Sequence, residues 1–319
     1  MFLPVKADFP LPRFPLLTVL ICLVCLGVHV KQQMDWQEYG NAVARFCAAD
    51  RSNLERMIFD RAADVMRNRG CADVMFQIAN DPELEPDEVI AEIAREVRPL
   101  TGLSVSASRE YVQQKLKEET RRYLMRVPED PDIGIAYYTG SWNPITMITS
   151  GFAHGDWLHL GFNLIFFFAF AATVEILVGP LWFVAFILAD SWFIGVTGSL
   201  FASLGAQHYW TVGLSGIVMG VMGMFAFLLP HGKIRCYYFF IVIFGSIAIP
   251  GWILVAWYLG KDVITLLAQE DYGMVNVMAH VMGGLGGYLF GFLFLDDVRR
   301  KAIALQADLD WREKEQRLR

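Results

Sequence analysis

The sequence predicts an all-α polytopic membrane protein, with six transmembrane helices and a helical extramembrane insertion between the first and second. Of its 319 residues, 55% are hydrophobic and only 19% are charged, whereas soluble domains are about a quarter charged. The charged residues concentrate in 31–126, and 145–295 is almost one apolar run. Glycine, proline and polar clusters interrupt that run at helix-length intervals, which is typical of successive membrane spans.

Six stretches approach the roughly 20 apolar residues that a membrane helix needs. Lys6 and Arg13 precede the first stretch, as in a signal peptide, but no small-residue cleavage site follows it. We therefore expect the first span to stay attached. The expected spans are 14–30, 158–177, 181–200, 215–229, 237–259 and 274–295.

Basic residues in the short loops predict the orientation of these spans. One side of the six-span arrangement carries only Lys261 in its short loops. Both termini should therefore be cytoplasmic, and we expect a bacterial inner (plasma) membrane. The expected parts are 1–30 (N-terminus and first span), 31–143 (outer insertion), 144–295 (membrane core) and 296–319 (charged, helical cytoplasmic tail). The basic residues on the opposite, cytoplasmic side are Lys6, Arg13, Lys233, Arg235, Arg299, Arg300 and Lys301.

The insertion has helical periodicity in three segments, each preceded by capping residues. Its Cys47 and Cys71 would face an oxidising compartment, so a disulfide is open. A helix of about 25 Å between them argues against the pairing, because bridged Cα atoms lie within about 7 Å of each other. The expected helices are 54–66, 89–97 and a third that begins at Ser106 or Ser108 and runs through Leu124.

Composition excludes two kinds of partner. A net charge of −6 argues against a nucleic-acid binder driven by bulk charge. The five cysteines have no paired CxxC spacing, and Cys22 and Cys25 lie in an apolar helix, where cysteine is usually a small hydrophobe. We expect no metal at these cysteines.

Polar side chains inside the spans cost several kcal/mol each and need an explanation. His159 lies near the start of the second span, Ser215 at the start of the fourth and His280 about two turns into the sixth. All three spans begin on the outer side, so the three side chains should reach a common depth. The other polar positions in the spans are Asn163, Glu175 and Asp190.

The fourth span combines a serine with glycines. Gly213 and Gly216 flank Ser215, which is typical of a tight turn that presents a nucleophile, but glycines at helical spacing also form packing faces. The span would be only about 22 Å long, so the preceding chain must dip inward to meet it. His280 similarly begins a glycine face with Gly283 and Gly287. The two faces predict that the fourth and sixth helices pack together and bring Ser215 within reach of His280.

His159 and Asn163 are four residues apart and share one face of the second helix. They lack an accompanying carboxylate or HExxH motif, which argues against zinc. An imidazole and an amide can instead donate hydrogen bonds to a developing oxyanion, beside the Ser215 N–H.

These residues resemble the rhomboid family of intramembrane serine proteases. The motifs are His154-x4-His159-x3-Asn163, Gly213-Leu214-Ser215-Gly216 and Ala279-His280-x-x-Gly283-x-x-x-Gly287, with Glu175 and Gly179 similar to the family's ExxxG. The resemblance covers about 142–295.

The resemblance implies a Ser215–His280 dyad without cofactor, an oxyanion hole from His159, Asn163 and the Ser215 amide, and a loop-holding role for His154. Its substrates would be single-span membrane proteins with an unstable helix. Two features depart from the family: Met219 stands where an aromatic residue is common, and the insertion has no family pattern.

Two other functions are possible for such a sequence. A catalytically silent rhomboid-like protein that binds membrane clients has no need for all of Ser215, His280, His159 and Asn163. A small transporter could use Asp190 and the histidines as a proton relay, but would predict internal repeats, and none is evident. Glu175 is interpreted as a structural acceptor of backbone hydrogen bonds, and Asp190 as buried and either protonated or hydrogen-bonded.

Overall fold

The computed structural model describes residues 2–67, 70–205, 208–240, 243–268 and 276–318. The chain divides into two compact units, Met1–Val30 with Gly134–Arg319, and Lys31–Ile133. We call them the membrane unit and the insertion unit and describe each by itself.

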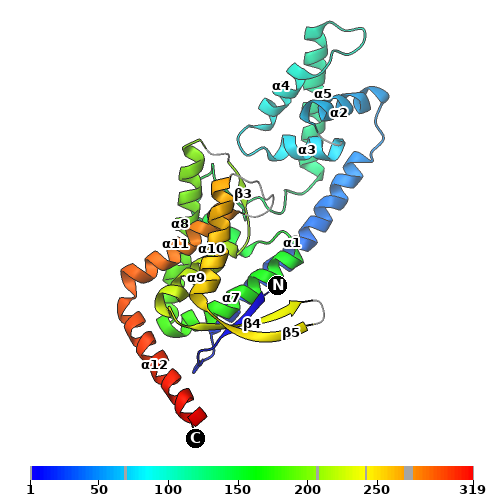
Figure 1. The fold of residues 1–319 in the computed structure, drawn as a ribbon. Coiled ribbons are helices and arrows are strands. Elements are labelled where there is room, and N and C mark those ends of the chain that lie inside the picture. The colour runs from blue at the N-terminus through cyan, green and yellow to red at the C-terminus, as the bar shows by residue number, and fades with distance from the viewer. Residues whose placement is uncertain (1, 68–69, 206–207, 241–242, 269–275, 319) are drawn as a thin grey trace. The chain divides into compact units, whose positions relative to one another are not determined.

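The membrane unit is a bundle of apolar helices (Figure 1). Five helices in the described part of the chain are long and apolar enough to cross a membrane, and α9 is a shorter apolar helix. The expected start of the sixth span at Met274 lies outside the described residues. The helices are α1 (Leu16–Cys47, which continues into the insertion unit), α6 (Thr146–Thr149), the 3-10 turn η1 (Ser150–Phe152), α7 (Trp157–Val178), α8 (Pro180–Ser203), α9 (Ser215–Leu228), α10 (Gly251–Ala268), α11 (Val277–Phe294) and α12 (Asp296–Leu318).

Helices α9 and α11 pack backbone against backbone. A Cβ atom added to Gly283 would collide with the carbonyl oxygen of Gly216, and one added to Gly287 would collide with that of Gly220. Only glycine permits so close an approach. The predicted packing of the fourth and sixth helices through their glycine faces is confirmed.

The expectation of an all-α fold is wrong at one end of the membrane unit. A three-stranded antiparallel sheet has the order β1-β4-β5, and it lies at the end of the bundle from which α12 extends (Figure 1). A second, two-stranded ladder pairs Tyr137–Tyr138 with Trp210–Thr211. The strands are β1 (Phe2–Ala7), β2 (Tyr137–Tyr138), β3 (Trp210–Thr211), β4 (Lys233–Phe240) and β5 (Ile243–Pro250).

The expected fifth span, 237–259, is therefore wrong in its first half. Residues 237–240 fall in β4 and 243–250 in β5, and the helix begins only at Gly251, directly after Pro250. The stretch is rich in aromatic and β-branched residues, which favour strands. Hydropathy alone does not separate a buried strand from a buried helix in such a run.

The insertion unit is helical and has its own apolar core. Two of the expected helices are confirmed as α2 and α4, and the third begins slightly earlier than expected, after the N-cap Ser104. Ser52 and Glu55 form a capping box at the start of α2. Helix α3 was not expected. In addition to the end of α1, the helices of the insertion unit are α2 (Asn53–Met66), α3 (Cys71–Asn80), α4 (Pro86–Glu96) and α5 (Val105–Arg126).

A disulfide joins Cys47 to Cys71, with their Cα atoms 5.8 Å apart. The argument that the intervening helix keeps these residues apart is wrong. The chain between Cys47 and α2, and between α2 and Cys71, is several residues long on each side, and each residue can span about 3.3 Å. Together the two connections offset the length of the helix.

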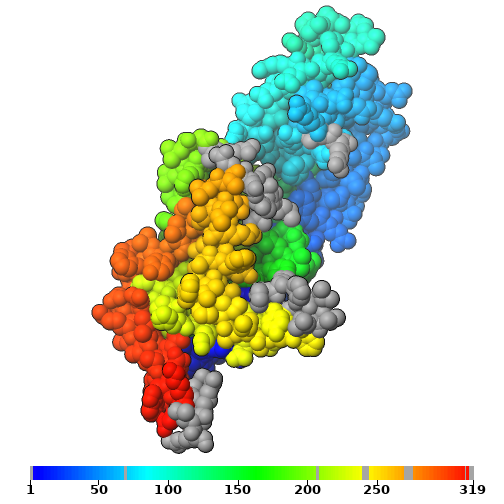
Figure 2. Space-filling view, viewed as in Figure 1, coloured from blue at the N-terminus to red at the C-terminus, as the bar shows by residue number. Residues whose placement is uncertain are grey.

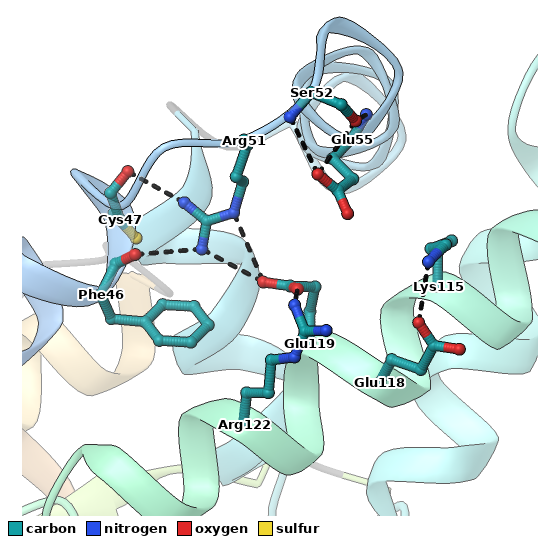
Figure 3. A network of polar contacts seen from close by, with 9 residues as sticks. All are labelled: Phe46, Cys47, Arg51, Ser52, Glu55, Lys115, Glu118, Glu119 and Arg122. Carbon is teal, nitrogen blue, oxygen red and sulfur yellow. Dashed lines mark hydrogen bonds and ion pairs between the residues drawn. The ribbon is translucent and has the colours of Figure 1, made fainter.

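Arg51 organises the polar interior of the insertion unit (Figure 3). Its guanidinium donates to the carbonyl oxygens of Phe46 and Cys47 at 3.0 Å each, at the end of α1. It also pairs with Glu119 at 3.2 Å, and the two side chains are only 8% and 7% exposed. Arg122 donates to the other Glu119 oxygen at 2.5 Å. The buried charges are thus paired, and carbonyls at the helix end that lack helical partners are satisfied.

Candidate active site

The first turn of α7 is held by its N-cap, Asp156. The Asp156 carboxylate accepts hydrogen bonds from the backbone N–H groups of Leu158 and His159, both at 2.8 Å. These bonds, foremost the one from His159, hold the pKa of Asp156 below its usual range. The cap fixes where α7 begins, and so places His159 in its first turn and Asn163 one turn later.

Gly213 brings the loop before α9 against these two side chains. Its φ is +116°, a conformation that favours glycine, and its N–H donates to the Ser150 carbonyl at 2.8 Å. A Cβ atom on Gly213 would lie 2.9 Å from His159 Cε1 and 3.7 Å from Asn163 Nδ2. The glycine therefore allows the backbone two residues before Ser215 to contact both polar side chains.

Hydrogen-bond donors without acceptors gather at this point. Asn163 is 6% exposed, and its buried Nδ2 has no hydrogen-bond partner among the described residues. Ser215 is the first residue of α9, so its N–H has no acceptor within the helix. A buried amide donor without a partner is costly and is typical of a functional position.

His154 holds two loops together. Its Nε2 accepts a hydrogen bond from the Leu214 N–H at 3.4 Å, so its Nδ1 carries the proton and donates to the Phe152 carbonyl at 3.3 Å. The His154 carbonyl lies 3.1 Å from Nδ1 of the buried His29. These contacts fix the loop before Ser215.

Ser215 and His280 lie on facing turns of α9 and α11. A Cβ atom on Gly216 would lie 3.3 Å from the carbonyl oxygen of Ala279, and these two residues are the chain neighbours of Ser215 and His280. Within the described residues, no hydrogen bond joins the Ser215 hydroxyl to the His280 ring. Catalytic hydrogen bonds are often long before substrate binds.

The His280 ring instead pairs with an acid that the sequence analysis missed. His280 Nδ1 lies 2.8 Å from Asp262 Oδ2, and the side chains are 16% and 8% exposed. Asp262 lies beyond Leu259, the expected end of the fifth span, and so falls in an expected loop where a charged residue needs no explanation. Its signal was helical spacing: Asp262 follows Leu254 by eight residues, precedes Thr265 by three and is the only acidic residue of α10.

Two further polar residues have different surroundings. Glu175 accepts hydrogen bonds from the N–H groups of Leu17 and Thr18, at 3.0 and 2.7 Å, which caps the start of α1 and matches its interpretation as a structural acceptor. In the part of the chain that the structure describes, neither carboxyl oxygen of the buried Asp190 has a hydrogen-bond partner. Asp190 adjoins Gly220 and Gly286 and lies in the wall of a cavity of about 150 Å³ between α8 and α11.

Met219, one turn after Ser215 on α9, is buried. Among the described residues, no group of three His, Cys, Asp or Glu side chains could hold a metal ion.

Similarity to known proteins covers about half of the chain. "Rhomboid protein 1, mitochondrial" of Saccharomyces cerevisiae is 26% identical over 52% of this chain and 47% of its own length. YdcA of Bacillus subtilis, also named a rhomboid, is 29% identical over 53% of this chain and 75% of its own. "Rhomboid-like protease 5" of Toxoplasma gondii is 34% identical over 46% and 16%.

The chain thus spans about half the length of the yeast protein. Residues 141–297 match the Rhomboid domain, and this range contains Ser215, His280, His159 and Asn163. With its five long apolar helices, the chain is a multi-pass membrane protein that belongs to the rhomboid family.

Proposed function

We propose that the chain is an intramembrane serine endopeptidase that cleaves single-span membrane proteins within or near their transmembrane segments. The observation that carries the proposal is the convergence of Ser215 at the start of α9, the unpartnered Asn163 amide and the His159 ring around the Gly213 turn. His280 is on the turn of α11 that faces the first turn of α9. A nucleophile, a base and oxyanion donors are the parts that acyl transfer requires.

In the proposed reaction, the Ser215 hydroxyl attacks the carbonyl carbon of the scissile peptide while His280 accepts its proton. His159, Asn163 and the Ser215 N–H donate to the oxyanion. The C–N bond breaks, and His280 gives its proton to the leaving amine. Water then attacks the carbonyl carbon of the acyl-enzyme while His280 accepts a proton from it. The ester bond to Ser215 breaks, His280 returns the proton to the Ser215 oxygen, and the acid product leaves.

The proposed topology has the insertion unit outside and both termini in the cytoplasm of a bacterium. The disulfide between Cys47 and Cys71 supports it, since disulfides persist in oxidising compartments. The sheet also gathers basic residues from separate segments, because Lys6 on β1 pairs in register with Arg235 on β4. Basic residues favour the cytoplasmic side.

A client-binding protein without catalytic activity is the second candidate. Among the described residues, no hydrogen bond joins the Ser215 hydroxyl to the His280 ring, as expected for a binder but also for a protease before substrate binds. The two candidates differ in whether Ser215 reacts.

The test is cleavage of a single-span reporter substrate in proteoliposomes, with Ser215→Ala and His280→Ala as the variants. Ser246→Ala and His231→Ala, both at exposed positions outside the site, are the matched controls. We expect wild type and controls to cleave and both site variants to be inactive while folded. If wild type cleaves none of several helix-destabilised substrates and a fluorophosphonate does not label Ser215, the client-binding function is favoured.

A further inference from the structure

Asp262 lies on the buried face of a helix whose other side is apolar and exposed. Helix α10 fills much of the face of the membrane unit seen in Figure 2, and its Trp257, Ile264 and Leu267 are 69–78% exposed. Asp262 is 6% exposed. An acidic side chain in such a helix is expensive and needs a partner.

The partner is one specific atom of His280. Asp262 Oδ2 lies 2.8 Å from Nδ1, and a carboxylate can only accept a hydrogen bond there. Nδ1 must therefore carry the proton, and in the neutral ring Nε2 is left without one. A neutral imidazole with a free Nε2 is the form that can take a proton from a serine hydroxyl.

The N-terminal end of α11 is held independently of the Asp262–His280 pair. Asn276 caps α11 by accepting from the Ala279 N–H at 3.0 Å, and its amide donates to Thr211 Oγ1 on β3, also at 3.0 Å. The glycine contacts with α9 fix the rest of the helix. The backbone of His280 thus has its own supports, and Asp262 acts on the orientation and tautomer of the ring.

We propose that Asp262 is a positioning residue that forms a triad with Ser215 and His280. It holds the His280 ring with Nε2 toward Ser215, and its charge stabilises the imidazolium that forms when the ring accepts the Ser215 proton. This inference rests on the proposed protease function for its kinetic consequence, but the tautomer of His280 is independent of activity.

The kinetic test compares Asp262→Asn with Asp262→Glu in proteoliposomes. Asparagine keeps the size of the side chain but can donate to Nδ1 and so favour the wrong tautomer. We expect kcat to fall by about 10²–10⁴-fold with KM nearly unchanged, and Asp262→Glu to recover part of the loss. Thr265→Val is the matched control, because it removes a polar group from the same buried face of α10 and should retain kcat.

The second readout is ¹⁵N NMR of histidine-labelled protein, with the His280 signals assigned from the His280→Ala spectrum. We expect Nδ1 to be protonated in wild type and in Thr265→Val, and the Nε2-protonated form to increase in Asp262→Asn. An Nε2-protonated ring in wild type would overturn the proposal even if no substrate is cleaved. So would unchanged kcat in Asp262→Asn, or an equal loss in Thr265→Val. Failure of the protease function itself appears separately, as an inactive wild type.

Discussion

Glu119 in the insertion unit and Asn163 in the membrane unit are both buried polar residues, but their surroundings differ. The Glu119 carboxylate is bonded to both Arg51 and Arg122. Among the described residues, the Asn163 amide donor and both Asp190 oxygens of the membrane unit have no hydrogen-bond partner. A buried charge that loses its partner costs several kcal/mol, whereas a donor without a partner has no hydrogen bond to lose. Substitution of Glu119 should therefore lower stability, and substitution of Asn163 tests its proposed role as an oxyanion donor.

Glu119→Ala tests the stabilising half of this comparison and should have the largest effect. The substitution leaves Arg51 buried without its partner, so we expect a loss of about 3–5 kcal/mol in the stability of the insertion unit. Proteolysis of the full chain under native conditions measures it. Glu118→Ala is the matched control, because Glu118 pairs with Lys115 at a half-buried position (Figure 3) and its loss leaves no deeply buried charge, so it should cost much less. Equal losses in the two variants would refute the role of the buried pair.

Asn163→Ala tests the functional half. Because Nδ2 has no partner to lose, we expect little change in thermal stability, while removal of an oxyanion donor should lower kcat by about 10²–10³-fold. Thr173→Val, at another buried polar position of α7, serves as control and should keep full activity. A variant that is destabilised yet retains kcat would place Asn163 among the structural residues.

Asp156→Ala should have the smallest effect and sharpens the comparison at an exposed position. The pKa of Asp156 is lowered in the folded protein, so its stabilising contribution is fully present above the unfolded pKa. It is lost as the pH falls through the lower, folded pKa. We expect the variant to unfold at a slightly lower temperature than wild type at neutral pH, and the difference to vanish in strong acid. A difference independent of pH would show that the carboxylate charge does not matter.

The sequence allowed the glycine packing of α9 and α11 to be predicted, since glycines at helical spacing have few other uses in a membrane helix. The capped helices of the insertion unit were predictable for a similar reason, because local capping chemistry signals where a helix begins. Three features depended on tertiary structure instead. Each of them joins segments that a hydropathy pattern treats separately. They are the pairing of strands β4 and β5, the disulfide between Cys47 and Cys71, and the pairing of Asp262 with His280.

The sheet also has a consequence for biosynthesis. Strand β1 begins at Phe2, but its partner β4 begins only at Lys233. Translation proceeds at about 5–20 residues per second, so β4 is synthesised on the order of 10–50 s after β1. Strand β1 is therefore among the last of these segments to reach its final position, and the sheet closes only after most of the helices have been synthesised.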